Sequence, residues 1–239
     1  MPEPNGLMKY ARTLLLLAVL SLVLTGSLSA APPADEAAIR QQVLSGIDAM
    51  YSMRFDDART PFNAVIQQQP DNPTGYFFRA TLHLWKYLFD KSEPDLKSFI
   101  TESDRTISIA EEALDKNSND SRARTYIGAM YGYRAMANIQ ADNYLKASLD
   151  ARSCYTYLSE TLQKDPRQYE AYLGMGIFNF VIGALPETSR LVMNIAGMSG
   201  NKERGLQQLR IAAEKAEYAG NDAKLVLGLL NVYYKGDYG

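Results

Sequence analysis

The sequence predicts an all-α fold, an α-solenoid built from antiparallel helix pairs. After residue 35, apolar residues recur three and four positions apart, which is the period of a helix with one buried face. Residues 100–117 (ITESDRTISIAEEALDKN) are typical, because Ile100, Ile107 and Leu114 share a face and charged residues fill the other. No stretch of the sequence shows sustained alternation flanked by hairpin turns, the pattern that predicts strands. The helical pattern also repeats along the chain, which predicts stacked repeat units.

The internal repeat has a period of 48 residues and appears in residues 65–80, 113–129 and 161–176. Each segment ends a helix, passes through a turn of proline, asparagine and aspartate, and starts a helix that contains a small residue. The small residue lets two antiparallel helices approach closely, and proline ends a helix because it has no N–H and clashes with the preceding turn. We therefore expect turns near Pro70, Ser118 and Pro166. Three sets of equivalent residues are each spaced 48 apart: Ile66, Leu114 and Leu162; Pro70, Ser118 and Pro166; and Ala80, Gly128 and Gly176.

The first unit, GIDAMYSMRFDDARTPFNAVIQQQPDNP (46–73), resembles a tetratricopeptide repeat (TPR). The distance from Gly46 to Ala80 equals the 34-residue period of that family. The resemblance implies a TPR-like, right-handed superhelix over residues 36–239. The residues that match the aromatic, small and closing positions of the second helix are Phe55, Ala58, Phe62, Val65 and Pro70.

Three features of the sequence depart from the TPR pattern. The later units have 14 extra residues, which is consistent with about two more turns in each helix. The resemblance is weaker over 81–112, where FDKSEPDLKSF (89–99) is expected to be an inserted loop. Pro61 lies inside a second helix, where we expect a bend.

The segment that follows Gly176 has its own pattern. In residues 177–217, Leu185-Pro186 breaks a helix, a short apolar helix is expected next, Gly197 and Gly200 form a turn, and a helix starts near Asn201. This order is similar to that in some exported bacterial repeat proteins, and more weakly to that in the eukaryotic inclusion-body clearance TPR family. There too, a Leu-Pro is followed by a glycine-rich turn, a charged pair and Gly-Leu-x-x-Leu.

The last residues, LVLGLLNVYYKGDYG (225–239), are similar to the first helix of a TPR followed by its turn, with Gly228 as the small residue. The second helix of that repeat is missing. We therefore expect the sequence to be a fragment, truncated at its C-terminal end inside a repeat. An unpaired helix would expose Leu225, Leu229 and Leu230. The alternative is that this helix is itself a cap.

The N-terminus has the pattern of a signal peptide over residues 1–30, with a short linker over 31–35. Lys9 and Arg12 precede an apolar run that is too short to span a membrane, and small residues follow it. We expect cleavage after Ser29 or Ala30 and export to the periplasm or the outside of the cell. Contact with the membrane would then be transient. The alternative is an uncleaved N-terminal anchor.

The composition argues against several classes of function. A net charge of −2 gives no electrostatic basis for binding nucleic acid. Cys154 and His83 are the single cysteine and the single histidine, so clusters of these residue types cannot hold a metal, and no cofactor is expected. No orienting partner is evident for His83 as a general base, and Cys154 is expected to be a buried, inert thiol. The sequence therefore favours a protein that is not an enzyme.

The TPR resemblance implies that first helices line a concave groove that binds peptide segments. The alternative for the aromatic residues is that they pack between neighbouring helices. The positions carried over by register are Tyr51, Trp85, Tyr133 and Val181, one in each repeat, and Arg40, Arg122 and Glu170 at an outer groove position.

These features together favour a noncatalytic interaction scaffold of the cell envelope, or a secreted one, that binds a protein or peptide partner through its concave face. One alternative is the repeat domain of a larger enzyme whose catalytic module is missing here. Another is an envelope protein associated with lipid or glycan, whose apolar groove takes an acyl chain.

Overall fold

The computed structural model describes residues 34–188, 190 and 197–234, and within these ranges it contains helices and no strand. The predicted signal peptide and the short apolar helix expected after Leu185-Pro186 lie outside the described residues. The helices are α2 (Ala34–Tyr51), α3 (Phe55–Gln68), α4 (Pro73–Asp90), α5 (Glu93–Lys116), α6 (Ser121–Gln140), α7 (Tyr144–Lys164), α8 (Ala171–Ala184), α10 (Lys202–Lys215) and α11 (Gly220–Tyr234).

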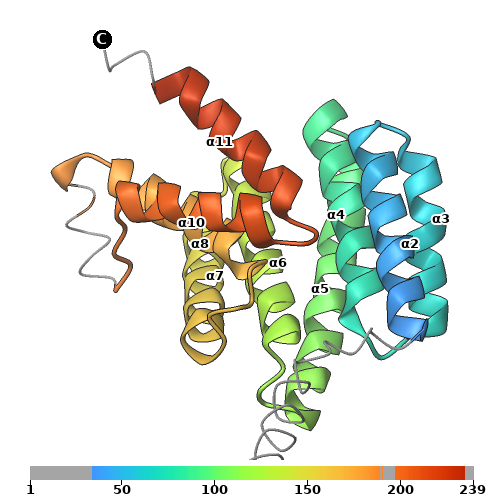
Figure 1. The fold of residues 1–239 in the computed structure, drawn as a ribbon. Helices are drawn as coiled ribbons and strands as arrows, with labels where there is room; N and C mark the ends of the chain where they lie inside the picture. Colours follow the sequence, from blue (N-terminus) through green and yellow to red (C-terminus); the bar gives the residue numbers. More distant parts are fainter. Residues whose placement is uncertain (1–33, 189, 191–196, 235–239) are drawn as a thin grey trace, which may run out of the picture. The chain divides into compact units, whose positions relative to one another are not determined.

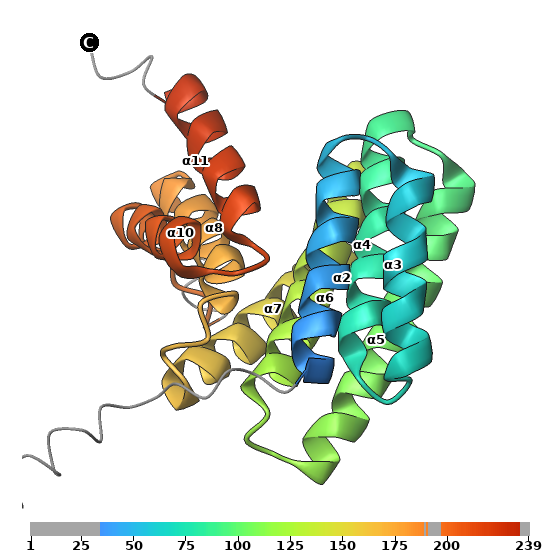
Figure 2. The same ribbon diagram turned by 45° about the vertical axis from the view of Figure 1, so that its right-hand side comes forward.

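The chain forms two compact units, Met1–Ala38 and Ile39–Gly239. Of the first unit, the structure describes the opening turn of α2. The second unit holds the rest of α2 and all the later helices. Its consecutive helices lie antiparallel and side by side, as Figures 1 and 2 show for α4 and α5. The predicted all-α fold with solenoid-like helix pairs is confirmed for the described residues.

The helices of the second unit are arranged in two layers. α4 packs against α3 and α5, α6 against α5 and α7, and α8 against α7 and α10. In addition, α4 contacts α6, α6 contacts α8, and α8 contacts α11. The first helices of successive pairs therefore form one layer and the second helices the other. The side chains on the exposed side of the first layer belong to the helices that the TPR resemblance assigns to the groove.

The predicted turns near Pro70, Ser118 and Pro166 are confirmed, because each lies in a gap between two helices. Asparagine and aspartate side chains start the helices that follow. Asn72 Oδ1 accepts from the Thr74 N–H at 2.9 Å, and Asp120 Oδ1 accepts from the Ala123 N–H at 2.9 Å. These bonds satisfy N–H groups that the first turn of a helix leaves without partners.

The small residues of the repeat lie at helix crossings, as predicted. A Cβ atom on Gly128 would lie 2.7 Å from a methyl carbon of Leu158, and one on Gly176 would lie 2.8 Å from Leu209 Cγ. Both leucines are almost completely buried. The longer repeats follow from longer helices, since α5, α6 and α7 have 24, 20 and 21 residues.

The inserted loop predicted over residues 89–99 is wrong. α4 continues to Asp90, α5 begins at Glu93, and a two-residue turn joins them. Lys91 adopts the left-handed conformation (φ 57°), and Ser92 Oγ caps α5 by accepting from the Asp95 N–H at 3.4 Å. Proline in the first turn of a helix costs no hydrogen bond, so the Glu-Pro-Asp run starts α5.

Pro61 lies inside α3, which runs through it to Gln68. Of the helices that the structure describes, none combines the length and apolar character required to cross a bilayer.

Candidate functional site

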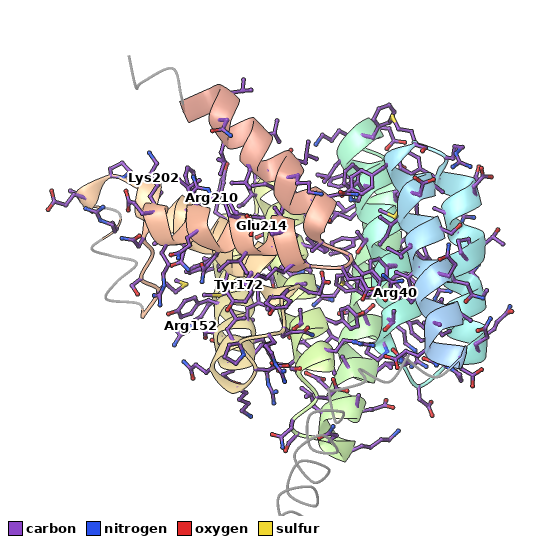
Figure 3. All side chains as sticks on the ribbon, in the orientation of Figure 1. Arg40, Arg152, Tyr172, Lys202, Arg210 and Glu214 are labelled. Carbon is purple, nitrogen blue, oxygen red and sulfur yellow. The ribbon has the colours of Figure 1, made fainter. Side chains whose placement is uncertain are left out.

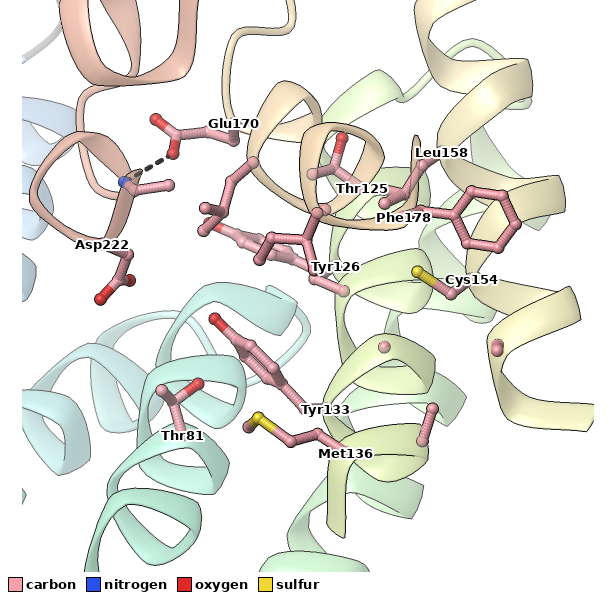
Figure 4. Close-up of a pocket in the computed structure, with 18 of the residues that line it drawn as sticks. Thr81, Thr125, Tyr126, Tyr133, Met136, Cys154, Leu158, Glu170, Phe178 and Asp222 are labelled. Carbon is pink, nitrogen blue, oxygen red and sulfur yellow. Dashed lines mark hydrogen bonds between the residues drawn. The ribbon is translucent and has the colours of Figure 1, made fainter. Parts of the chain in front are cut away.

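A cavity of about 560 Å³ opens on the layer of first helices in the second unit. Its walls come from α2, α4, α6, α7 and α8, from Glu170 just before α8, and from the turn before α11 and the first turn of that helix. Figure 4 shows Thr81, Tyr133 and Met136 on one side and Leu158 and Phe178 on the other. Most of the lining side chains are apolar or aromatic. The first helices therefore enclose a hollow in place of a completely filled core.

The four groove positions predicted from the repeat register, Tyr51, Trp85, Tyr133 and Val181, all line this cavity. The rings of Tyr51 and Trp85 meet edge to face with centroids 5.6 Å apart, and the Tyr133 ring lies 6.0 Å from that of Phe77. These aromatic residues thus pack against neighbouring helices and also face the cavity. Their role in binding a partner stays a prediction.

The three outer positions behave differently from one another. Glu170 lines the cavity and binds the turn before α11, since Oε1 accepts from the N–H groups of Glu217 and Tyr218 at 2.7 and 3.0 Å. Its other oxygen accepts from the Ala219 N–H at 2.8 Å, the bond drawn in Figure 4. Glu170 therefore holds the end of α10 and the start of α11 to the start of α8.

Arg40 and Arg122 do not line the cavity. Arg40, on α2 (Figure 3), forms an ion pair with Glu217. Arg122 lies in the first turn of α6, and its charge partly opposes the rise that burial causes in the pKa of Glu170. Arg40 thus contacts the turn that Glu170 binds, and Arg122 acts electrostatically on Glu170 itself.

Two carboxyl groups lie at one end of the cavity (Figure 4). Its charged lining residues are Glu170 and Asp222, which Figure 4 places together, away from Cys154 and Phe178. Burial raises the pKa of both carboxyl groups, and Glu170 adds to the rise at Asp222. The Asp222 carboxylate accepts a hydrogen bond from the Tyr51 hydroxyl. Burial and the nearby Asp222 in turn raise the pKa of Tyr51 and of Tyr133 above its usual range.

Asp222 was missed at the sequence level. It looks like an ordinary acidic residue in the first turn of a helix, which the helix dipole favours. The 48-residue register could not reach it, because the segment between α8 and α11 does not keep that period. Its proximity to Tyr51 comes from a contact between residues 171 positions apart.

His83 has an orienting partner that the sequence did not reveal, so that expectation is wrong. Its Nδ1 lies 3.0 Å from Asp95 Oδ1, and Lys86 Nζ lies 3.4 Å from Asp95 Oδ2. Burial acts to raise the pKa of Asp95, but the contacts with His83 and Lys86 outweigh it and hold that pKa below its ordinary value. The three side chains lie outside the cavity lining and join α4 to α5.

Replacing Asp95 with asparagine is expected to lower the free energy of unfolding by about 1 kcal/mol at pH 7. Because the folded-state pKa of Asp95 is depressed, its contribution is present above the unfolded-state pKa and is lost as the pH falls through the folded-state value. The difference between wild type and variant, measured by urea unfolding, should therefore shrink as the pH is lowered through 4 and towards 2. A constant difference across this range would contradict the ion-pair assignment.

Cys154 is buried in the cavity wall, and burial raises the pKa of its thiol to about 12. The thiolate that would react is therefore scarce at neutral pH, in agreement with the inert thiol expected from the sequence. Among the residues that the structure describes, no group of three or more histidine, cysteine, aspartate or glutamate side chains is placed to hold a metal ion.

Comparison with family models points to the same repeat superfamily. The family model described as Iml2/Tetratricopeptide repeat protein 39 matches residues 130–236. Among solved structures, a thermophilic TPR protein from Thermus thermophilus is similar with a TM-score of 0.44 and 15% identity, covering 81% of this chain and 84% of that chain. The family match includes the Leu-Pro and Gly-Leu-x-x-Leu segment singled out in the sequence. The resemblance to the TPR superfamily is thereby confirmed, and residues 130–236 are similar to its Iml2/Tetratricopeptide repeat protein 39 family.

Proposed function

We propose that this protein is a noncatalytic interaction scaffold that binds a segment of a partner protein in the cavity of its first-helix layer. The observation that carries the proposal is the apolar mouth of the cavity. Large apolar side chains that line it remain exposed, with Val181 at 51% and Ile139 at 53% of full exposure. Exposed apolar surface next to a concave site is typical of a binding surface. The others at the mouth are Tyr51, Met136, Tyr144 and Ile177.

The size of the cavity supports the proposal. Ligand sites in proteins commonly measure about 300–1,000 Å³, and this cavity falls within that range. Its walls come from several helix pairs, so an extended or helical segment could contact several repeats at once. We also propose that the protein acts outside the cytoplasm, which rests on the signal-peptide pattern of residues 1–30.

The proposal can be tested with a phage-displayed library of random 12-residue peptides selected on the purified protein. Replacing Val181 with glutamate is expected to weaken binding of the selected peptides at least tenfold, because it puts a charge on the apolar wall. Trp85 is the single tryptophan and lines the cavity, so its fluorescence reports occupancy by tryptophan-free peptides.

The matched control is the replacement of Val232 with glutamate. Val232 is an exposed valine of α11, at 76% exposure, and does not line the cavity. This variant should bind the selected peptides as the wild type does. If no peptide is selected, or if both variants bind equally well, the cavity is not a site for partner segments.

The same cavity also suits an acyl chain, because its walls are apolar and its charged groups lie at one end. Mass spectrometry of an organic extract of the purified protein would identify a bound lipid. A stoichiometric lipid that the Val181 to glutamate change removes would favour this second function.

A further inference from the structure

The acidic groups on the cavity wall are two carboxyl groups from different parts of the chain. Among the lining residues that the structure describes, the carboxyl groups are those of Glu170 and Asp222, and none of these residues is a lysine, arginine or histidine. A buried carboxylate normally has a basic partner or several hydrogen-bond donors, because burial of an unpaired charge is costly. The two carboxylates can therefore be compared by what surrounds each of them.

Glu170 has several hydrogen-bond donors. It accepts three backbone N–H groups at 2.7–3.0 Å, and the nearby Arg122 favours its charged form. Asp222 has the Tyr51 hydroxyl as a donor, and the charge that acts on it most is that of Glu170, which is also negative. No ion pair that the structure records among the described residues includes Asp222.

The surroundings of Asp222 suit an organic cation. Tyr51, Trp85 and Tyr133 line the cavity near this carboxylate, and aromatic faces attract lysine and arginine side chains. The rest of the wall is apolar and suits the flanking residues of a peptide. The charge of the cavity and its apolar walls are thus complementary to an apolar segment that carries one positive group.

We propose that the partner segment is apolar with a single lysine or arginine, and that Asp222 receives this basic side chain beside Tyr51 and Tyr133. This inference rests on the proposed function, since it names the partner chemistry of the same cavity. The positive group is thus a side chain of the partner protein, and not the head group of a small molecule.

The test uses the 12-residue peptides selected on the wild-type protein. They should be enriched in one lysine or arginine among apolar residues. For a selected peptide, replacing the basic residue with norleucine should weaken binding to the wild type about tenfold or more. The Asp222→Asn variant should bind the basic peptide more weakly than the wild type does, by a similar factor. This variant should also bind the basic peptide and the norleucine peptide about equally, because the change in the protein and the change in the peptide remove the same interaction.

The control for Asp222→Asn is Asp56→Asn, a change in the first turn of α3 at an exposed carboxylate. It should leave peptide binding unchanged. Two results would overturn this inference and leave the proposed function standing. In the first, the selected peptides need Val181 but carry no basic residue. In the second, the Asp222→Asn variant binds the basic peptide as tightly as the wild type does. Absence of any selected peptide would overturn both.

A last comparison distinguishes a small amphiphile from a peptide. Titration of Trp85 fluorescence with dodecylammonium chloride and with dodecanol should show weak binding of either, well below that of the selected peptides. Tight binding of dodecylammonium that needs Asp222, without any selected peptide, would mean that the cavity receives a cationic amphiphile and would overturn the assignment to a partner segment.

Discussion

Replacing Gly205 with alanine is expected to destabilise the fold by about 1–3 kcal/mol. Gly205 lies in α10 at its crossing with α8, where two glycines face each other. A Cβ atom there would lie 2.4 Å from the Phe180 backbone N and 2.7 Å from the Gly176 carbonyl O. Backbone atoms cannot turn aside as a side chain can, so α8 and α10 would have to separate. Urea unfolding at neutral pH measures the loss.

The matched control is Gly228, which also lies inside a helix. A Cβ atom at Gly228 would meet nothing within 4 Å. Alanine there should stabilise the protein by up to about 1 kcal/mol, because glycine is the poorer helix former. Helix propensity favours alanine equally at Gly205, so the opposite signs of the two changes isolate the steric term. Equal effects at the two positions would mean that α8 and α10 are not in close contact.

The parts of the fold that could be predicted are those with local causes. Helix periodicity, proline and asparagine act over a few residues, so the turns near Pro70, Ser118 and Pro166 were found. The repeat register carried the same logic from unit to unit, and it placed Trp85 and Tyr133 on the cavity wall. Register works because equivalent residues of stacked helices face the same way.

The misread turn between α4 and α5 shows where local reasoning was incomplete. The run from Phe89 to Phe99 is polar and contains a proline, which looks like a loop. Ser92 followed by Glu-Pro-Asp is also a helix start, with a capping hydroxyl, a proline in the first turn and acidic residues near the positive end of the helix dipole. Missing this turn also hid the partner of His83, because Asp95 lies just beyond it.

The acidic end of the cavity had no signal in the sequence. Glu170 meets residues 47–49 positions further along the chain, and Asp222 meets Tyr51 across most of the repeats. Such contacts depend on how the helix pairs stack, and stacking is set by packing over the whole array. A carboxylate that binds a backbone turn and one that lacks a basic partner look alike in a sequence.

Replacing Glu170 with alanine is expected to lower the free energy of unfolding by about 2 kcal/mol and to loosen α11 more than the other helices. The change leaves three backbone N–H groups without their acceptor in the turn that joins α10 to α11. Hydrogen exchange should become faster in residues 217–230, while amides of α4 and α5 exchange as in the wild type. Uniform acceleration along the chain would contradict this local role.

Replacing Glu170 with glutamine removes the charge and keeps part of the acceptor. The amide oxygen can still accept from the N–H groups of Glu217 and Tyr218, while an NH2 group takes the place of the oxygen that accepts from Ala219. The change also removes a carboxylate whose pKa burial has raised. A raised folded-state pKa means that the native state binds protons more readily than the unfolded state, so ionisation of Glu170 costs stability as the pH rises above the ordinary carboxyl range. The glutamine variant should therefore remain within about 1 kcal/mol of the wild type at pH 7, and its stability should fall less than that of the wild type between pH 4 and pH 7. If glutamine is as damaging as alanine, one acceptor oxygen is not enough, and both carboxylate oxygens of Glu170 are needed to hold the turn before α11.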